Sequence, residues 1–79
     1  MPTTKPITAE RIEATEQELI ISVAGEDVRI RWEDCSPKLA SARPQQRTEA
    51  ELSPGGYGIH WSTIDEDLAV GALISSIQT

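Results

Sequence analysis

Apolar and polar residues alternate in two separate stretches of the chain, each with a short polar break in its middle. In the first stretch, residues 19–23 alternate, a polar break occupies 24–27, and residues 28–32 alternate again. Alternation with period two places the apolar side chains on one face of a strand, and a glycine-containing break favours a tight turn. This stretch predicts an antiparallel β-hairpin, with Arg29 and Arg31 on the solvated face.

The second stretch repeats this arrangement. Residues 50–52 alternate, the sequence Ser-Pro-Gly-Gly at 53–56 supplies turn chemistry, and residues 57–61 alternate again. A second hairpin is therefore expected. The apolar face of the sheet should carry Leu19, Ile21, Val23, Val28, Ile30, Trp32, Leu52, Ile59 and Trp61. Because the chain has no Phe, Trp32 and Trp61 are the expected largest blocks of the core.

Two helices are expected between and after the hairpins. The Ser-Pro pair at 36–37 is typical of a helix start, since a hydroxyl accepts from free amides and proline fits the first turn. Pro44 should end this short helix, and Leu39 is its inward anchor. Capping residues at 62–67 predict a second helix that runs to about Ser76. Its apolar stripe consists of Ile64, Leu68, Ala72, Leu73 and Ile77.

The amino-terminal residues carry conflicting signals. Residues 8–18 have helix-favouring composition, but their apolar positions fit neither period, and we interpret them as an irregular first strand. Residues 1–6, with two prolines, are expected to be a flexible terminus, and residues 7–79 a single domain. The predicted fold class is α+β: a small antiparallel or mixed β-sheet from two hairpins, with a short middle helix and a C-terminal helix packed on it.

Composition narrows the possible functions. The chain has 79 residues, of which 13 are acidic, 7 are Lys or Arg and one is Cys, and its net charge is −6. One Cys excludes an internal disulfide framework, and no Cys/His cluster has zinc spacing. No apolar run approaches the ~20 residues of a membrane span, and the first residues contain no signal core. We therefore expect a cytoplasmic protein without a membrane partner.

Charge is unevenly distributed along the chain. All 7 Lys and Arg lie at or before Arg47, whereas residues 48–79 carry 5 acids and no Lys or Arg. A phosphate backbone favours clustered cations, so this distribution argues against direct nucleic-acid binding. It favours a protein partner, and in particular a basic one.

The run from Glu51 to Ile74, with Gly-Ile-His-Trp at 58–61 and Asp-Glu-Asp-Leu-Ala-Val at 65–70, resembles the signature of a bacterial domain-of-unknown-function family, number 2442. The likeness extends from about Ile7 to Ile77. It implies a small α+β domain with strands before a C-terminal helix, and it implies no activity. Some relatives look like the first half of proteins with a helix-turn-helix domain, which suggests regulatory or adaptor roles. Ala69 stands where the family often has a helix-capping Ser, which moves the expected helix start to Thr63 or Asp65.

His60 is the only histidine, and it invites a catalytic interpretation. Asp65 or Asp67 could orient its ring, and Cys35 could act as nucleophile. In the predicted register, however, His60 faces away from the apolar side of its strand and is half-exposed. Cys35 lies just before a helix start, where the pKa of a thiol can fall, but a lone thiol is more often inert. We assign no catalytic residue.

Asp65, Glu66 and Asp67 allow three interpretations. They could cap a helix, bind a divalent cation, or form a docking surface for a basic partner. A Ca²⁺ loop needs a longer motif with a turn glycine, so no metal and no cofactor is assigned. The expected partner-binding residues are these three and His60.

These observations favour a non-enzymatic protein-interaction or regulatory adaptor module that uses its acidic C-terminal segment or a sheet edge. The alternative is a small-ligand-binding or enzymatic domain centred on His60 and the nearby carboxylates. A chain this small rarely encloses a pocket alone, so that alternative requires a dimer interface. A third hypothesis is a structural homodimer that pairs its edge strands across a two-fold axis.

Overall fold

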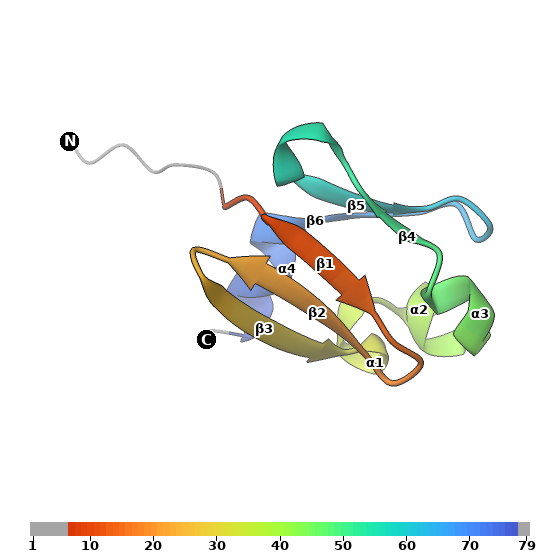
Figure 1. Ribbon diagram of the computed structural model, residues 1–79. Helices are drawn as coiled ribbons and strands as arrows, with labels where there is room; N and C mark the ends of the chain where they lie inside the picture. The colour runs from red at the N-terminus through yellow and green to blue at the C-terminus, as the bar shows by residue number, and fades with distance from the viewer. Residues whose placement is uncertain (1–6, 78–79) are drawn as a thin grey trace.

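The computed structural model describes residues 7–77, which form two three-stranded antiparallel sheets and four helices (Figure 1). In chain order the elements are β1 (Arg11–Ala14), β2 (Glu18–Val23), β3 (Glu26–Arg31), α1 (Trp32–Cys35), α2 (Pro37–Ser41), α3 (Pro44–Arg47), β4 (Ala50–Leu52), the 3-10 turn η1 (Pro54–Gly56), β5 (Gly58–Trp61), β6 (Glu66–Ala69) and α4 (Val70–Ile77). The first sheet has the order β1-β2-β3 and the second β4-β5-β6. The expected flexible terminus at 1–6 lies outside the described residues. The α+β class is confirmed, but the two predicted hairpins lie in separate sheets rather than in one.

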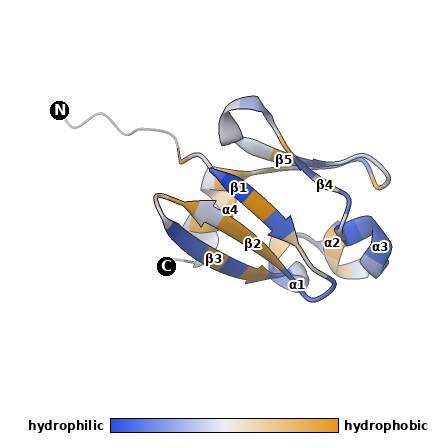
Figure 2. Ribbon diagram, in the orientation of Figure 1, coloured by the Kyte–Doolittle hydropathy of each residue, from blue (hydrophilic) through white to orange (hydrophobic). Residues whose placement is uncertain are grey.

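The first sheet follows the predicted hairpin closely. Strands β2 and β3 pair from Glu18 with Arg31 to Val23 with Glu26, around a turn at residues 24–25. Strand β1 adds to β2 and confirms a strand within residues 8–18. Figure 2 shows the alternation of hydrophilic and hydrophobic residues along β1 and β3. Trp32 begins α1 instead of continuing the strand, and it still turns its ring into the core.

The short middle helix begins and ends as predicted, because α2 stops at Ser41, before Pro44, but a further helix follows at once. The Ser36 hydroxyl accepts a hydrogen bond from the Leu39 amide at 3.1 Å, which caps α2. Pro44 then takes the first position of a further helix, α3, that the sequence analysis missed. Proline suits this position because its fixed φ is helical and its missing N–H would have had no partner there.

The predicted helix start at residues 62–67 is wrong. Residues 62–65 form a turn in which Asp65 has a φ of 51°, and Glu66–Ala69 form β6. A strand here completes the second sheet, because β6 pairs with β5 along its whole length. Helix α4 begins only at Val70, directly after Ala69. The Val70 amide donates to the Tyr57 carbonyl at 2.9 Å. The first N–H group of α4 is therefore hydrogen-bonded by the main chain and needs no capping side chain.

The core lies between the two sheets and α4. Residues of β2, β5 and α4 belong to one buried cluster, and Figure 1 shows α4 behind the first sheet. Its fully or nearly buried apolar members are Ala9, Leu19, Ile21, Ile30, Trp32, Leu39, Ile59, Trp61, Val70, Leu73 and Ile74. Val23, Val28 and Leu52 are only partly buried. Tyr57, expected to alternate inward with Ile59, is 54% exposed because β5 begins after it.

The two tryptophans meet at the centre of the core, as expected for the largest side chains. Their rings pack edge to face at a centroid distance of 6.1 Å and an angle of 84°. Each indole N–H also has a partner: Trp32 donates to the Thr15 carbonyl at 2.8 Å, and Trp61 donates to the Arg47 carbonyl at 3.1 Å. This arrangement buries large apolar area without leaving a polar atom unpaired.

Arg47 connects elements that are distant in sequence. Its guanidinium donates to the carbonyls of Leu39 and Ala40 in α2 at 2.9 and 2.8 Å, and to that of Glu16 at 3.3 Å. Since its own carbonyl accepts from Trp61, one residue links α2, the β1–β2 turn and the second sheet. Among residues 7–77, no helix is long and apolar enough to cross a lipid bilayer.

Candidate functional site

The outer face of the second sheet carries a row of three polar residues. Glu51 of β4 pairs with His60 of β5, which pairs in turn with Asp67 of β6. Because neighbouring residues on a strand point to opposite faces, the buried Ile59 and Trp61 leave His60 on the outside. The His60 ring donates from Nδ1 to Asp67 Oδ1 at 2.7 Å, with the two side chains 41% and 75% exposed.

The four residues predicted to bind a partner do not all share this face. Asp65 lies in the exposed turn before β6, and its main-chain oxygen accepts from the Lys38 ammonium at 3.1 Å. Glu66 pairs with Trp61 and is half-buried, so it lies on the opposite side of β6 from Asp67. Its carboxylate accepts from the Asp67 amide at 3.3 Å. The structure thus brings His60 and Asp67 together and turns Glu66 away.

Glu51 is the residue of this row that the sequence analysis missed. The signal was present, since Glu51 alternates with Ala50 and Leu52 just as His60 alternates with Ile59 and Trp61. What could not be read from the pattern was the register that sets Glu51 opposite His60. We refer to Glu51, His60, Asp67 and the adjacent Asp65 as the acidic face.

The carboxylates of the acidic face have no Lys or Arg partner within residues 7–77. Within residues 7–77, Lys and Arg form two ion pairs with carboxylates, Arg29 with Glu18 and Arg31 with Glu33. Both arginines belong to β3 of the first sheet. The contact from Lys38 reaches a carbonyl oxygen and leaves the Asp65 carboxylate without an ion pair. A surface with excess negative charge and partly exposed hydrogen-bonding groups is therefore available beside β5.

His60 and Asp67 have the geometry of an oriented imidazole, but the third member of a nucleophilic set is missing. No Ser, Thr or Cys hydroxyl or thiol within residues 7–77 hydrogen-bonds to His60. Cys35, the candidate nucleophile, ends α1 and is half-buried. Burial, together with the negative charge of Asp34, raises the pKa of its thiol from 9.0 to about 11. The pKa is thus not lowered, although a position just before a helix start would allow it, and Cys35 is unsuited to nucleophilic chemistry near neutral pH.

Cys35 is expected to react slowly with iodoacetamide in the folded protein. At pH 8, a rise of two units in thiol pKa lowers the thiolate fraction by about 100-fold. Alkylation of the native chain should accelerate with pH up to about 11, whereas the chain in denaturant should already react readily at pH 9. Half-maximal native alkylation below pH 9 would contradict the buried environment, and Cys35→Ser controls for other reactive groups.

The same thiol gives stability a defined pH dependence. Between pH 9 and about 11 the native thiol keeps its proton while the unfolded thiol loses it. The unfolded chain then binds fewer protons, so the contribution of Cys35 to the free energy of unfolding should fall as pH rises through this window. Comparison of the wild type with Cys35→Ser over that range isolates the effect.

The metal interpretation of Asp65, Glu66 and Asp67 has no geometric support. Within residues 7–77, no group of three His, Cys, Asp or Glu side chains comes close enough to hold a metal ion. The strand explains this, because Glu66 and Asp67 point to opposite faces of β6. In a loop, the carboxylates of Glu66 and Asp67 could turn toward a common ion, but on a strand they point away from each other.

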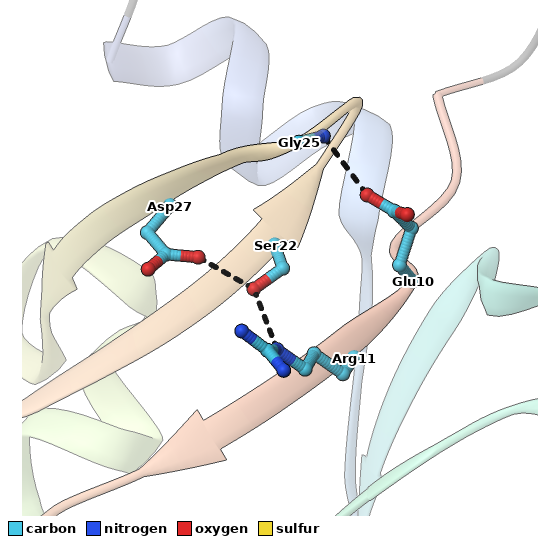
Figure 3. A pocket seen from close by; sticks show the side chains of 5 residues that line it. All are labelled: Glu10, Arg11, Ser22, Gly25 and Asp27. Carbon is cyan, nitrogen blue, oxygen red and sulfur yellow. Dashed lines mark hydrogen bonds between the residues drawn. The ribbon is translucent and has the colours of Figure 1, made fainter.

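The first sheet has shallow hollows on its own outer face. The hollow in Figure 3 measures about 280 Å³ and is lined by Glu10, Arg11, Ser22, Gly25 and Asp27. Ser22 donates to Asp27 at 2.6 Å and accepts from Arg11 at 3.3 Å, while Glu10 accepts from the Gly25 amide at 2.9 Å. These polar groups satisfy one another, and no large apolar side chain lines the hollow, unlike the apolar and aromatic lining typical of a small-molecule pocket. His60 does not line this hollow.

The fold and this surface define a small α+β domain of two three-stranded antiparallel sheets with a C-terminal helix. The chain belongs to the family described as protein of unknown function (DUF2442), whose sequence profile matches residues 9–79. The resemblance noted from the sequence is thereby confirmed. No curated protein matches the chain.

Two solved structures are similar to this one. A protein of unknown function from Rhodospirillum rubrum has a TM-score of 0.77 at 23% identity, over 90% of this chain and 88% of that one. An uncharacterized protein from Chromobacterium violaceum has a TM-score of 0.70 at 24% identity, over 91% of this chain and 68% of that one. At these identities the likeness shows the fold and carries no activity with it.

Proposed function

We propose that this protein is a non-enzymatic interaction or regulatory adaptor module, and that its acidic face docks a basic segment of a partner protein. The observation that carries the proposal is the row of Glu51, His60 and Asp67 on an exposed sheet face, with no Lys or Arg paired to its carboxylates. A basic partner would supply the missing cations. Charged faces of this kind increase the rate of encounter and select among partners.

Two further features support a docking surface here. Residues 48–79 contain no Lys or Arg that could neutralise the acidic face from its own sheet. Tyr57, the exposed large hydrophobic residue of the described chain, lies between η1 and β5, three residues before His60. Tyrosines are enriched among the residues that dominate binding energy, so Tyr57 is the exposed aromatic residue that a partner docked on the second sheet could also contact.

The double variant Glu51→Lys/Asp67→Lys is expected to lose its partner. Both side chains lie on the outer face of their strands, so the change reverses the sign of the surface without touching the core. Captured from bacterial lysate at about 50 mM salt, a bound protein should fall by about tenfold in the variant. The same protein should also leave the wild type at about 500 mM salt, because exposed charges are then screened.

The matched control is Glu13→Lys/Glu16→Lys, which makes the same charge change on exposed residues of the first sheet and its turn. Capture by this control should equal that of the wild type. If both double variants lose the partner equally, net charge rather than the acidic face determines binding. If neither loses it, the acidic face is not the docking surface.

A ligand-binding or enzymatic role centred on His60 is the second candidate, and one observation favours it. The 2.7 Å contact with Asp67 fixes the ring and would leave Nε2 to meet a substrate. A copy of the chain would have to supply the missing walls and nucleophile. His60→Ala separates the two roles, since it should abolish ligand binding but weaken capture of a basic partner less than Glu51→Lys/Asp67→Lys does, because the carboxylates of Glu51 and Asp67 remain.

A further inference from the structure

Strand β3 ends the first sheet with an unpaired edge. The two-residue turn at Ala24 and Gly25 makes Val23 and Glu26 a hydrogen-bonded pair. Every second residue of an antiparallel strand points its N–H and C=O away from the partner, so Asp27 and Arg29 direct theirs outward. No backbone hydrogen bond within residues 7–77 reaches these groups.

The other sheet edges are less available for pairing with a further strand. Strand β1 lies against β4, and the Ala9 amide just before it donates to the Gly56 carbonyl at 2.8 Å (Figure 1). In the second sheet, β4 has three residues and β6 has four, whereas β3 has six. A long exposed edge is the feature that most invites pairing with another strand.

We propose that β3 pairs antiparallel with β3 of a second copy of the chain, joining two first sheets into one six-stranded sheet. The order of charged residues along β3 favours a second copy of the chain as the partner. Asp27 and Arg29 lie on the same outer face with opposite signs, so two antiparallel copies place each Asp27 opposite the Arg29 of the other copy. A strand presenting like charges at these positions is repelled.

The backbone specifies the same register. Arg31 is the N-cap residue of α1 and is not available for strand pairing. The outward N–H and C=O groups that remain belong to Asp27 and Arg29, and Val28 lies midway between these two residues. With the two-fold axis at Val28, the N–H of Asp27 donates to the C=O of Arg29 in the second copy, and the C=O of Asp27 accepts from the N–H of that Arg29. The symmetric pair makes the same two contacts, so the interface has four hydrogen bonds. The half-buried Val28 then meets its counterpart on the inner face. This interface is small, and we expect a dissociation constant of about 1–100 μM.

A charge-swap experiment on the full chain tests this interface. Asp27→Arg and Arg29→Asp each place like charges opposite one another, so each variant alone should dimerise at least tenfold more weakly than the wild type in sedimentation equilibrium. Mixed in equal amounts, the two variants regain opposite charges at both positions and should form a heterodimer of wild-type affinity. Both sites are exposed, and circular dichroism melts check that each variant folds.

The control Glu13→Arg reverses a charge on the same sheet face but on β1, and it should leave dimerisation unchanged. A wild-type chain that stays monomeric at about 500 μM, well above the expected dissociation constant, overturns the proposal. So does a dimer that Asp27→Arg leaves intact, because the copies would then meet elsewhere. The interface is independent of the acidic face, since Glu51→Lys/Asp67→Lys should keep the dimer and Asp27→Arg should keep the basic partner.

Discussion

Replacement of Trp61 with alanine is expected to leave the protein largely unfolded at 25 °C. The indole is completely buried, packs edge to face on Trp32 and donates to the Arg47 carbonyl. Truncation of a buried tryptophan costs about 3–5 kcal/mol. A folded chain of this length has about 4–12 kcal/mol of stability in total, and small proteins lie near the lower end.

Urea unfolding followed by the fluorescence of the remaining Trp32 measures this loss. Tyr57→Ala is the matched aromatic truncation at an exposed position, and it should change the free energy of unfolding by about 0.5 kcal/mol or less. Trp61→Phe keeps a ring but removes the N–H, so it should fall between the two. A Trp61→Ala protein with a near-wild-type urea midpoint would mean that the second sheet does not depend on this packing.

Gly56→Ala is expected to have the second large effect. Gly56 has a φ of 77°, and a Cβ there would collide with the carbonyl oxygen of Ala9, which is main chain and cannot swing aside. The left-handed conformation costs a non-glycine residue about 1–2 kcal/mol. Relief of the collision would also break the hydrogen bond from the Ala9 amide to the Gly56 carbonyl, for about 1 kcal/mol more.

Gly25→Ala isolates the steric part of that effect. Gly25 has a similar φ of 81°, but nothing lies within 4 Å of the position its Cβ would occupy. It should therefore lose only the conformational contribution, and thermal or urea unfolding should show Gly56→Ala to be at least twice as destabilising. Equal losses at the two positions would show that the approach of η1 to Ala9 contributes nothing to stability.

Local patterns predicted the parts of the fold in which neighbours along the chain are also partners in space. The first hairpin was predictable because its turn and its alternation lie within fourteen residues, and both favour the same register. Ser36 before Pro37 was likewise sufficient to place the start of α2, since the capping hydroxyl and the amide it binds are three residues apart. The burial of both tryptophans followed from the scarcity of other large side chains.

Residues 62–69 show where local pattern was insufficient. Carboxylates after Ser and Thr are typical of a helix start, and only the free edge of β5 made a strand the better outcome there. Pro44 was ambiguous in the same way, since proline suits both the end of one helix and the start of the next. In each case the deciding partner lies elsewhere in the structure.

The sequence by itself determined the α+β class, the two hairpins and most of the core, because these depend on the period and the chemistry of adjacent residues. Only the tertiary structure decided that the hairpins separate into two sheets, that Glu51 joins His60 and Asp67, and that Arg47 links three elements. Burial likewise raised the pKa of Cys35, although a position just before a helix start can lower the pKa of a thiol. The physical reason is common to all of these: register between strands, desolvation and long-range hydrogen bonds depend on residues that approach one another only when the whole chain folds.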